Sequence, residues 1–129
     1  GYTNVVRLGA EHLSEDGSIV LVSGAPARRA KPGQAAIASV GGAVEQFVRA
    51  VTAELAPKRI NVVSPGVIDT PMFGNDAAAR AKMLDGATAK NLIPRAGTPE
   101  EVAEGIMFVV KNDFVTGTTI DVDGGWILS

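Results

Sequence analysis

The sequence predicts an α/β fold in which helices cover both faces of a parallel, doubly wound sheet. Three short segments rich in apolar and β-branched residues, 18–23, 60–63 and 118–122, have the pattern of strands. They alternate with longer segments whose apolar residues recur every three or four positions, as in helices. This alternation favours parallel pairing with right-handed crossovers, and no internal repeat interrupts it.

The first two elements are predicted at 2–13 and 18–23. In the first, helical spacing places on one face Val5, Val6, Gly9, Ala10 and Leu13. The second is a continuous apolar run between Gly17 and Gly24. Such a run is typical of a strand buried on both faces.

The strongest helical pattern covers 34–55, and Pro57 ends it. Its apolar stripe consists of Val40, Val44, Phe47, Val48, Val51 and Leu55. A second buried strand follows at 60–63, and Pro65-Gly66 then turns the chain.

The C-terminal third contains two predicted helices and the last strand. Residues 76–84 form a short helix. Thr98 caps a second helix, with Pro99 in its first turn and Glu101 completing a capping box, and this helix runs to about Val110. The strand at 118–122 has β-branched residues at four of its five positions.

Composition excludes several classes of function. The 129 residues carry a net charge of −2, so no extended basic surface for nucleic acid is expected. The one basic cluster, Arg28, Arg29 and Lys31, has the character of a solvated loop. There is no cysteine, and His12 and the carboxylates lack metal-ligand spacing, so no metal site is expected. No apolar run is long enough to span a membrane, which favours a soluble cytoplasmic protein.

A phosphate-binding turn is missing from this fold. Dinucleotide folds open with a strand and a glycine-rich turn that seats the pyrophosphate on a helix N-terminus. Gly41-Gly42 lies within a predicted helix and Gly124-Gly125 follows the last strand, so neither pair forms that turn.

A resemblance to a known family rests on the segment 32–45 and on two stretches that follow it. These are Ile60-Asn61-Val62-Val63-Ser64-Pro65-Gly66-Val67-Ile68-Asp69-Thr70-Pro71-Met72 and Val115-Thr116-Gly117-Thr118-Thr119-Ile120-Asp121-Val122-Asp123-Gly124-Gly125. In this order and spacing they resemble the C-terminal half of a short-chain dehydrogenase/reductase. The resemblance implies that residues 1–129 are a single partial Rossmann-like domain, with the N-terminal cofactor-binding half absent. It implies NAD or NADP as cofactor of the intact protein, and we expect neither to bind this chain tightly.

The family's catalytic Ser, Tyr and Lys fall on residues that carry no such chemistry. The matching positions are Gly24, Ile37 and Gly41. Ser23, next to the Ser position, is the one candidate catalytic residue, since its hydroxyl could orient a carbonyl oxygen. The alternative is a strand-end serine bonded to a nearby backbone group. For Gly41-Gly42, either close approach of another helix or close approach of the cofactor ribose would explain two glycines within a helix.

The resemblance also implies a cofactor-facing loop and a lid. The nicotinamide would lie against Pro65, Gly66, Val67, Ile68 and Thr70, with the backbone near Val67 and Ile68 and the Thr70 hydroxyl meeting its carboxamide. Gly66 would let the backbone approach closely. The lid over a small-molecule substrate would include Met72, Phe73, Met83, Leu84 and Leu92, and ordinary surface packing is the alternative.

Three functions therefore remain open from the sequence. The first is an NAD(P)-dependent oxidoreductase acting on a carbonyl or alcohol. The second is a catalytically inactive family member serving as a nucleotide-binding or scaffolding subunit, and the third is a free-standing small binding domain. We also expect a homodimer or homotetramer, because small residues line the side of the 34–55 helix away from its apolar stripe: Ala36, Ser39, Gly42 and Ala43.

Overall fold

The computed structural model describes all 129 residues as one layered α/β unit. The three strands are β1 (Ser18–Val22), β2 (Arg59–Pro65) and β3 (Thr119–Val122). The helices are α1 (Tyr2–Gly9), α2 (Ala35–Leu55), α3 (Ala77–Thr88) and α4 (Pro99–Lys111). Short 3₁₀ turns complete the chain at 10–12, 25–27, 71–73 and 126–128.

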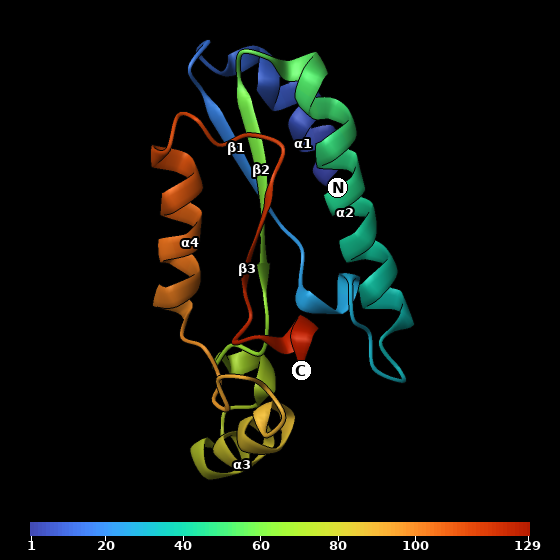
Figure 1. Ribbon diagram of the computed structural model, residues 1–129, viewed down its shortest axis with the longest axis vertical. Helices are drawn as coiled ribbons and strands as arrows, with labels where there is room; N and C mark the ends of the chain where they lie inside the picture. Colours follow the sequence, from blue (N-terminus) through green and yellow to red (C-terminus); the bar gives the residue numbers. More distant parts are fainter.

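The strands form one parallel sheet in the order β1-β2-β3, which confirms the predicted fold class. Figure 1 shows α1 and α2 on one side of this sheet and α4 on the other, with α3 and the C-terminus near the end at which the strands finish. Each crossover passes through a helix, because parallel neighbours cannot be joined by a tight turn.

The core lies between α2 and the middle strand. It consists of Val6, Val44, Val48, Ile60 and Val62, and α4 covers the opposite face of β2 with Val109. On α1, Tyr2 packs edge-on against Phe47 of α2 with 5.3 Å between the ring centroids. The helices are thus held by the faces that the apolar spacing indicated.

Three details differ from the sequence prediction. The first helix ends at Gly9 and continues as a 3₁₀ turn, and within it Val6 is buried whereas Val5 is exposed. Val40 is 60% exposed although it shares a helix face with the buried Val44 and Val48, so the apolar stripe of α2 is not covered at the helix start. Strand β1 is only half-buried, since it has a strand neighbour on one side alone.

Capping explains where the two C-terminal helices begin. Asp76 accepts a hydrogen bond from the Ala79 N–H at the start of α3. Thr98 and Glu101 form the predicted capping box at the start of α4. The α3 helix continues to Thr88, four residues beyond the predicted end.

Candidate functional site

The carboxyl ends of all three strands meet at one end of the sheet. Ser23, Gly66 and Asp123 follow β1, β2 and β3 there. Ligands of open parallel α/β sheets bind beside these ends. A cavity of about 420 Å³ lies at this place, within the usual size of small-molecule sites. Its lining residues are Ser23, Gly24, Ala25, Pro26, Gln34, Ile37, Pro65, Gly66, Val67, Ile68, Thr70, Met72, Phe73, Ala87 and Trp126.

The loop after β2 presents free polar groups to this cavity. Its backbone pairs with Gly97, whose N–H donates to the Val67 carbonyl and whose carbonyl accepts from the Asp69 N–H, both at 2.9 Å. The N–H and carbonyl of Ile68, which lies between these two bonds, make no hydrogen bond within the chain. The Thr70 hydroxyl also has no partner in the chain. A carboxamide needs both donors and acceptors, so these groups fit the predicted nicotinamide contact.

Gly66 is required by the protein's own packing. A Cβ on Gly66 would lie 2.7 Å from the Cα of Asp123, closer than two non-bonded carbon atoms can approach. The glycine therefore allows the ends of β2 and β3 to come together, whether or not a ligand lies beside it.

The two positions that match the family's Tyr and Lys have different surroundings. Ile37 lines the cavity and is 58% exposed. Gly41 is buried, and a Cβ there would lie 2.9 Å from the Ala27 Cβ. Within the chain, the loop after β1 requires this glycine, because it packs directly onto the helix backbone.

The Ser23 hydroxyl is bound to a carboxylate that the sequence did not reveal as important. It donates to Glu45 Oε1 at 2.8 Å, and Arg28 Nε lies 3.3 Å from Glu45 Oε2. The guanidinium of Arg28 also pairs with Asp121 of β3. A hydroxyl has one proton, so in this arrangement Ser23 can only accept a hydrogen bond from a ligand. The sequence left two roles open for Ser23, a hydroxyl that orients a carbonyl oxygen or a strand-end serine bonded to the backbone, and neither included a carboxylate partner. The feature of the sequence that could have revealed this contact is Glu45, a carboxylate beside the apolar stripe of α2.

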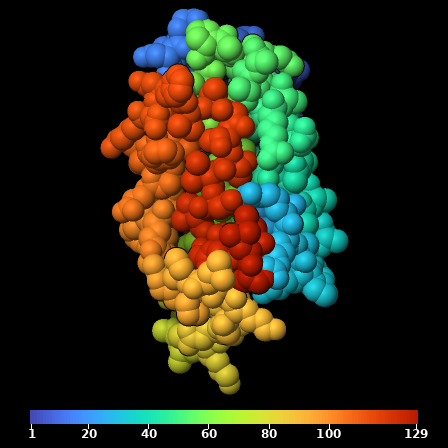
Figure 2. Space-filling model, viewed as in Figure 1, coloured from blue at the N-terminus to red at the C-terminus, as the bar shows by residue number.

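The basic loop is exposed at residues 28–31, as predicted for a solvated segment, and its side chains also make contacts within the chain. Besides the pairs of Arg28, Arg29 donates to the Trp126 carbonyl at 3.2 Å, and the Trp126 indole N–H donates to the Arg29 carbonyl at 3.2 Å. The Lys31 ammonium lies 3.7 Å from the centre of the Trp126 ring. Figure 2 shows this loop (light blue) against the C-terminal segment (red).

Trp126 is a cavity residue that sequence reasoning missed. The Asp123 carboxylate holds its turn in place by accepting from the N–H groups of Gly125, at 2.8 Å, and Ile127, at 3.0 Å. The indole is buried. The only feature of the sequence that pointed to Trp126 is its position directly after Gly124-Gly125.

The predicted lid is only partly assembled over the cavity. Met72 and Phe73 line it, although Met72 is 82% exposed. Leu84 of α3 is buried, whereas Met83 and Leu92 are exposed. These last three residues do not line the cavity.

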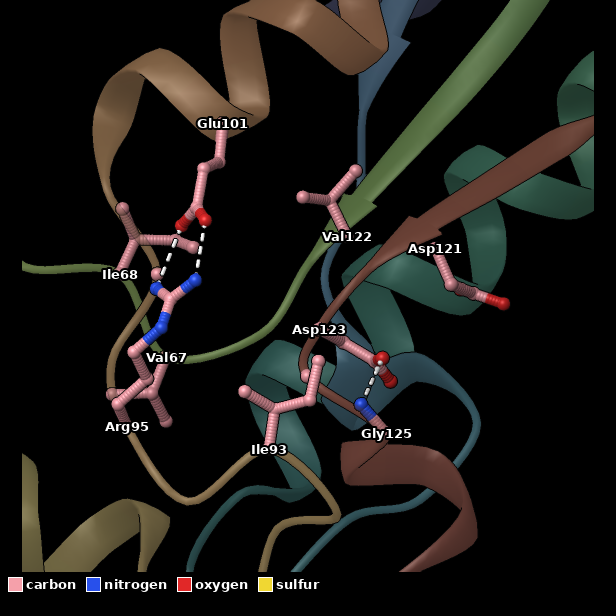
Figure 3. Close-up of a pocket in the computed structure, with 11 residues that line it drawn as sticks. Val67, Ile68, Ile93, Arg95, Glu101, Asp121, Val122, Asp123 and Gly125 are labelled. Carbon is pink, nitrogen blue, oxygen red and sulfur yellow. Dashed lines mark hydrogen bonds and ion pairs between the residues drawn. The ribbon is translucent and has the colours of Figure 1, made fainter.

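A second cavity of about 360 Å³ lies on the other side of the Val67–Ile68 backbone (Figure 3). Arg95 forms a two-pronged ion pair with Glu101 across it, at 2.9 and 2.5 Å. Hydrogen bonds from Arg95, and next from the Thr98 N–H, lower the pKa of Glu101 from 4.5 to about 2. The same pair raises the pKa of Arg95. Arg95 and Glu101 satisfy one another, and Asp121 and Asp123 are bound to Arg28 and to the C-terminal turn, so we place the candidate site in the first cavity.

Two properties of the whole chain concern metal binding and membrane insertion. No three His, Asp or Glu side chains lie close enough together to hold a metal ion. No helix is both long and apolar enough to cross a bilayer.

Comparison with known proteins identifies the family. The sequence profile described as enoyl-(acyl carrier protein) reductase matches residues 1–127. The short-chain dehydrogenase/reductase ATR9 of Stachybotrys chlorohalonatus is 40% identical over 111 residues, which cover 86% of this chain and 44% of that protein. The cyclopentanol dehydrogenase of Comamonas testosteroni is 41% identical over 116 residues, covering 85% of this chain and 45% of the relative.

Solved structures agree with the sequence comparison. A small-chain dehydrogenase crystallised in complex with NADPH superposes with a TM-score of 0.91 at 32% identity, over 98% of this chain and 58% of the other. The chain spans about half the length of the curated relatives it matches. With the parallel sheet and the loop at 65–70 in place, the chain belongs to the short-chain dehydrogenase/reductase family.

Proposed function

We propose that the protein is an NAD(P)-dependent oxidoreductase that interconverts a carbonyl group and an alcohol on a small molecule. Residues 1–129 would supply the nicotinamide-facing loop and the substrate-facing wall, and the phosphate-binding half would come from the part of the fold that this sequence lacks. The observation that carries the proposal is the free Ile68 backbone and Thr70 hydroxyl at the carboxyl ends of three parallel strands. The NADPH complex of a similar structure and the cyclopentanol dehydrogenase relative support it.

The chain's own residues have defined tasks in this proposal. Ile68 and Thr70 bind the carboxamide and orient the nicotinamide ring. When bound, the nicotinamide would supply the hydride. Met72 and Phe73 line the substrate side of the cavity, and the exposed Met72 would have to close over a bound substrate to exclude water. Ile37 and Gly41 cannot transfer a proton, so the proton comes from water or from a group outside this chain.

Reduced nicotinamide mononucleotide provides the direct test, because it carries the nicotinamide without needing a pyrophosphate-binding turn. We expect weak binding, with a Kd on the order of 1 mM, detected by a change in the fluorescence of Trp126, the chain's only tryptophan. Thr70→Val should weaken binding roughly threefold to tenfold, the effect of one net hydrogen bond, whereas Thr70→Ser should retain it. The absence of any binding would contradict the proposal.

A turnover measurement distinguishes an active oxidoreductase from an inactive nucleotide-binding subunit, the two functions that the sequence left open for a family member. The bound nucleotide is mixed with cyclopentanone, and the loss of reduced-nicotinamide absorbance is followed. Slow oxidation supports an oxidoreductase. Binding without oxidation of the nucleotide by any ketone tested would instead support the inactive nucleotide-binding subunit. Parallel measurements with NADH and NADPH on a form that includes the phosphate-binding half would assign the cofactor.

Partners and location stay predictions of the same proposal. We expect a homodimer or homotetramer in the cytoplasm, with a small-molecule substrate and neither nucleic acid nor membrane as partner. The small-residue face of α2 is exposed at Ala36, Ser39 and Ala43, as such assembly requires.

A further inference from the structure

The wall of the cavity beyond the nicotinamide-facing loop contains no charged side chain. It is built by the loop after β1, the start of α2, the 71–73 turn, α3 and the C-terminal turn. Its members are Ser23, Gly24, Ala25, Pro26, Gln34, Ile37, Met72, Phe73, Ala87 and Trp126. A charged ligand group entering here would lose its hydration without gaining a partner of opposite charge.

The basic side chains nearest in sequence are engaged elsewhere. Arg28 pairs with Glu45 and Asp121, and Arg29 is bonded to the Trp126 carbonyl. Lys31 lies over the Trp126 ring. None of the three basic residues lines the cavity, so the wall is uncharged as a whole.

One side-chain hydrogen-bond donor in this wall has no partner within the chain. The Ser23 proton is given to Glu45, and the Trp126 indole proton to the Arg29 carbonyl. The Gln34 side-chain oxygen accepts from the Lys31 N–H at 2.7 Å, and this bond fixes which end of the carboxamide is oxygen. The Gln34 amide nitrogen makes no hydrogen bond within the chain. Gln34 lies three residues before Ile37, so both are on the same side of the start of α2.

We infer that this wall binds an uncharged, largely apolar carbonyl compound, whose oxygen accepts a hydrogen bond from the Gln34 amide nitrogen. Ile37, Phe73 and Met72 contact its hydrocarbon part. The inference rests on the proposed function for its choice of a carbonyl group, and it adds the substrate class and the residue that selects it. Gln34 donates the hydrogen bond to the carbonyl oxygen that neither Ile37 nor Ser23 can donate.

Three small molecules of one skeleton test this without any nucleotide. Benzophenone is neutral and carries the carbonyl, diphenylmethane lacks it, and 4-benzoylbenzoate adds a carboxylate. Calorimetry or ligand-observed NMR should rank benzophenone first, with benzoylbenzoate at least about tenfold weaker. Irradiated benzophenone should cross-link to peptides that contain Ile37 or Met72, which locates the bound molecule.

Variants at Gln34 identify the donor. Gln34→Glu keeps an acceptor for the Lys31 N–H and removes the donor, so it should weaken benzophenone about threefold to tenfold and diphenylmethane much less. Gln34→Met should act in the same direction without adding a charge. Gln46→Glu, a matched change at an exposed position of α2, should leave both affinities unchanged.

The inference is overturned if benzoylbenzoate binds as tightly as benzophenone, if the cross-links map outside the cavity, or if folded Gln34 variants bind benzophenone like the wild type. These outcomes are independent of the nicotinamide mononucleotide experiment. Ketone binding with no nucleotide binding would support this inference and contradict the proposed function, and the reverse result would do the opposite.

Discussion

Gly41 lies directly beneath Ala27, so close that a Cβ on Gly41 would come within 2.9 Å of the Ala27 Cβ. This contact holds the loop after β1 against the helix at the place where the family has its catalytic lysine. A side chain at position 41 would therefore require the loop after β1 to shift.

The first prediction compares two neighbouring glycines. Replacing either Gly41 or Gly42 with Ala gains about 0.5–1 kcal/mol of helix propensity. At Gly41 the added methyl group collides with Ala27, and overpacking of this kind costs about 1–3 kcal/mol. At Gly42 the nearest atom is 3.9 Å away. Denaturant unfolding should show Gly41→Ala destabilised and Gly42→Ala slightly stabilised. Adding Ala27→Gly should restore Gly41→Ala, and no restoration would contradict the contact.

The second prediction concerns restoration of the family's catalytic pair. Ile37→Tyr with Gly41→Lys should not by itself give ketone reduction in the nucleotide-bound protein, because the lysine must displace Ala27. Adding Ala27→Gly should permit activity if the cofactor geometry is retained. Equal activity of the double and triple variants would show that the loop moves freely.

The third prediction concerns the carboxylate that receives the Ser23 proton. Glu45→Ala should lower the free energy of unfolding by about 1–3 kcal/mol, because Ser23 and Arg28 lose a buried partner. Glu45→Gln keeps an acceptor for Ser23 and should lose less. Glu54→Ala, an exposed change on the same helix, provides the control for helix content. A loss at position 45 no larger than at 54 would contradict the role of this network.

The fourth prediction is a pH dependence. The pKa of Glu101 is lowered from 4.5 to about 2 in the folded protein, first by the hydrogen bond from Arg95. A depressed carboxyl pKa stabilises the folded state fully above the unfolded value, and that stabilisation is lost as the pH falls from about 4.5 towards 2. The stability difference between wild type and Glu101→Gln should therefore shrink over this range.

Arg95→Gln should remove the larger share of this pH dependence, because the Thr98 N–H still lowers the pKa of Glu101, and the double variant should lose no more than Glu101→Gln. Urea unfolding at several pH values measures all four proteins. The effect is small because the pair is exposed to solvent. A stability difference that stays constant with pH would contradict the assignment to this pair.

The fifth prediction concerns assembly through α2. Ala43→Leu places a large side chain on the exposed small-residue face and should shift a dimer or tetramer towards the monomer in size-exclusion light scattering. Ala103→Leu, at an exposed position of α4, is the matched control. A wild-type chain that is monomeric at high concentration would contradict this interface.

Local sequence patterns determined the elements and the class of fold. The spacing of Val44 and Val48, the capping box at Thr98 and Glu101, and the apolar runs of the three strands act over a few residues, so they can be recognised without the structure. The order of strands and helices then left parallel pairing as the expected topology. The loop at 65–70 was found through its resemblance to the family.

Contacts between residues far apart in the sequence were decided only by the tertiary structure. Glu45 binds Ser23 across 22 positions, and Arg29 and Trp126 meet across 97. No local pattern encodes such pairs, because they depend on how the sheet and helices bring their ends together. For the same reason the sequence could show that Ile37 and Gly41 lack catalytic chemistry, whereas the uncharged wall, the free Gln34 amide and the contact of Gly41 with Ala27 required the folded chain.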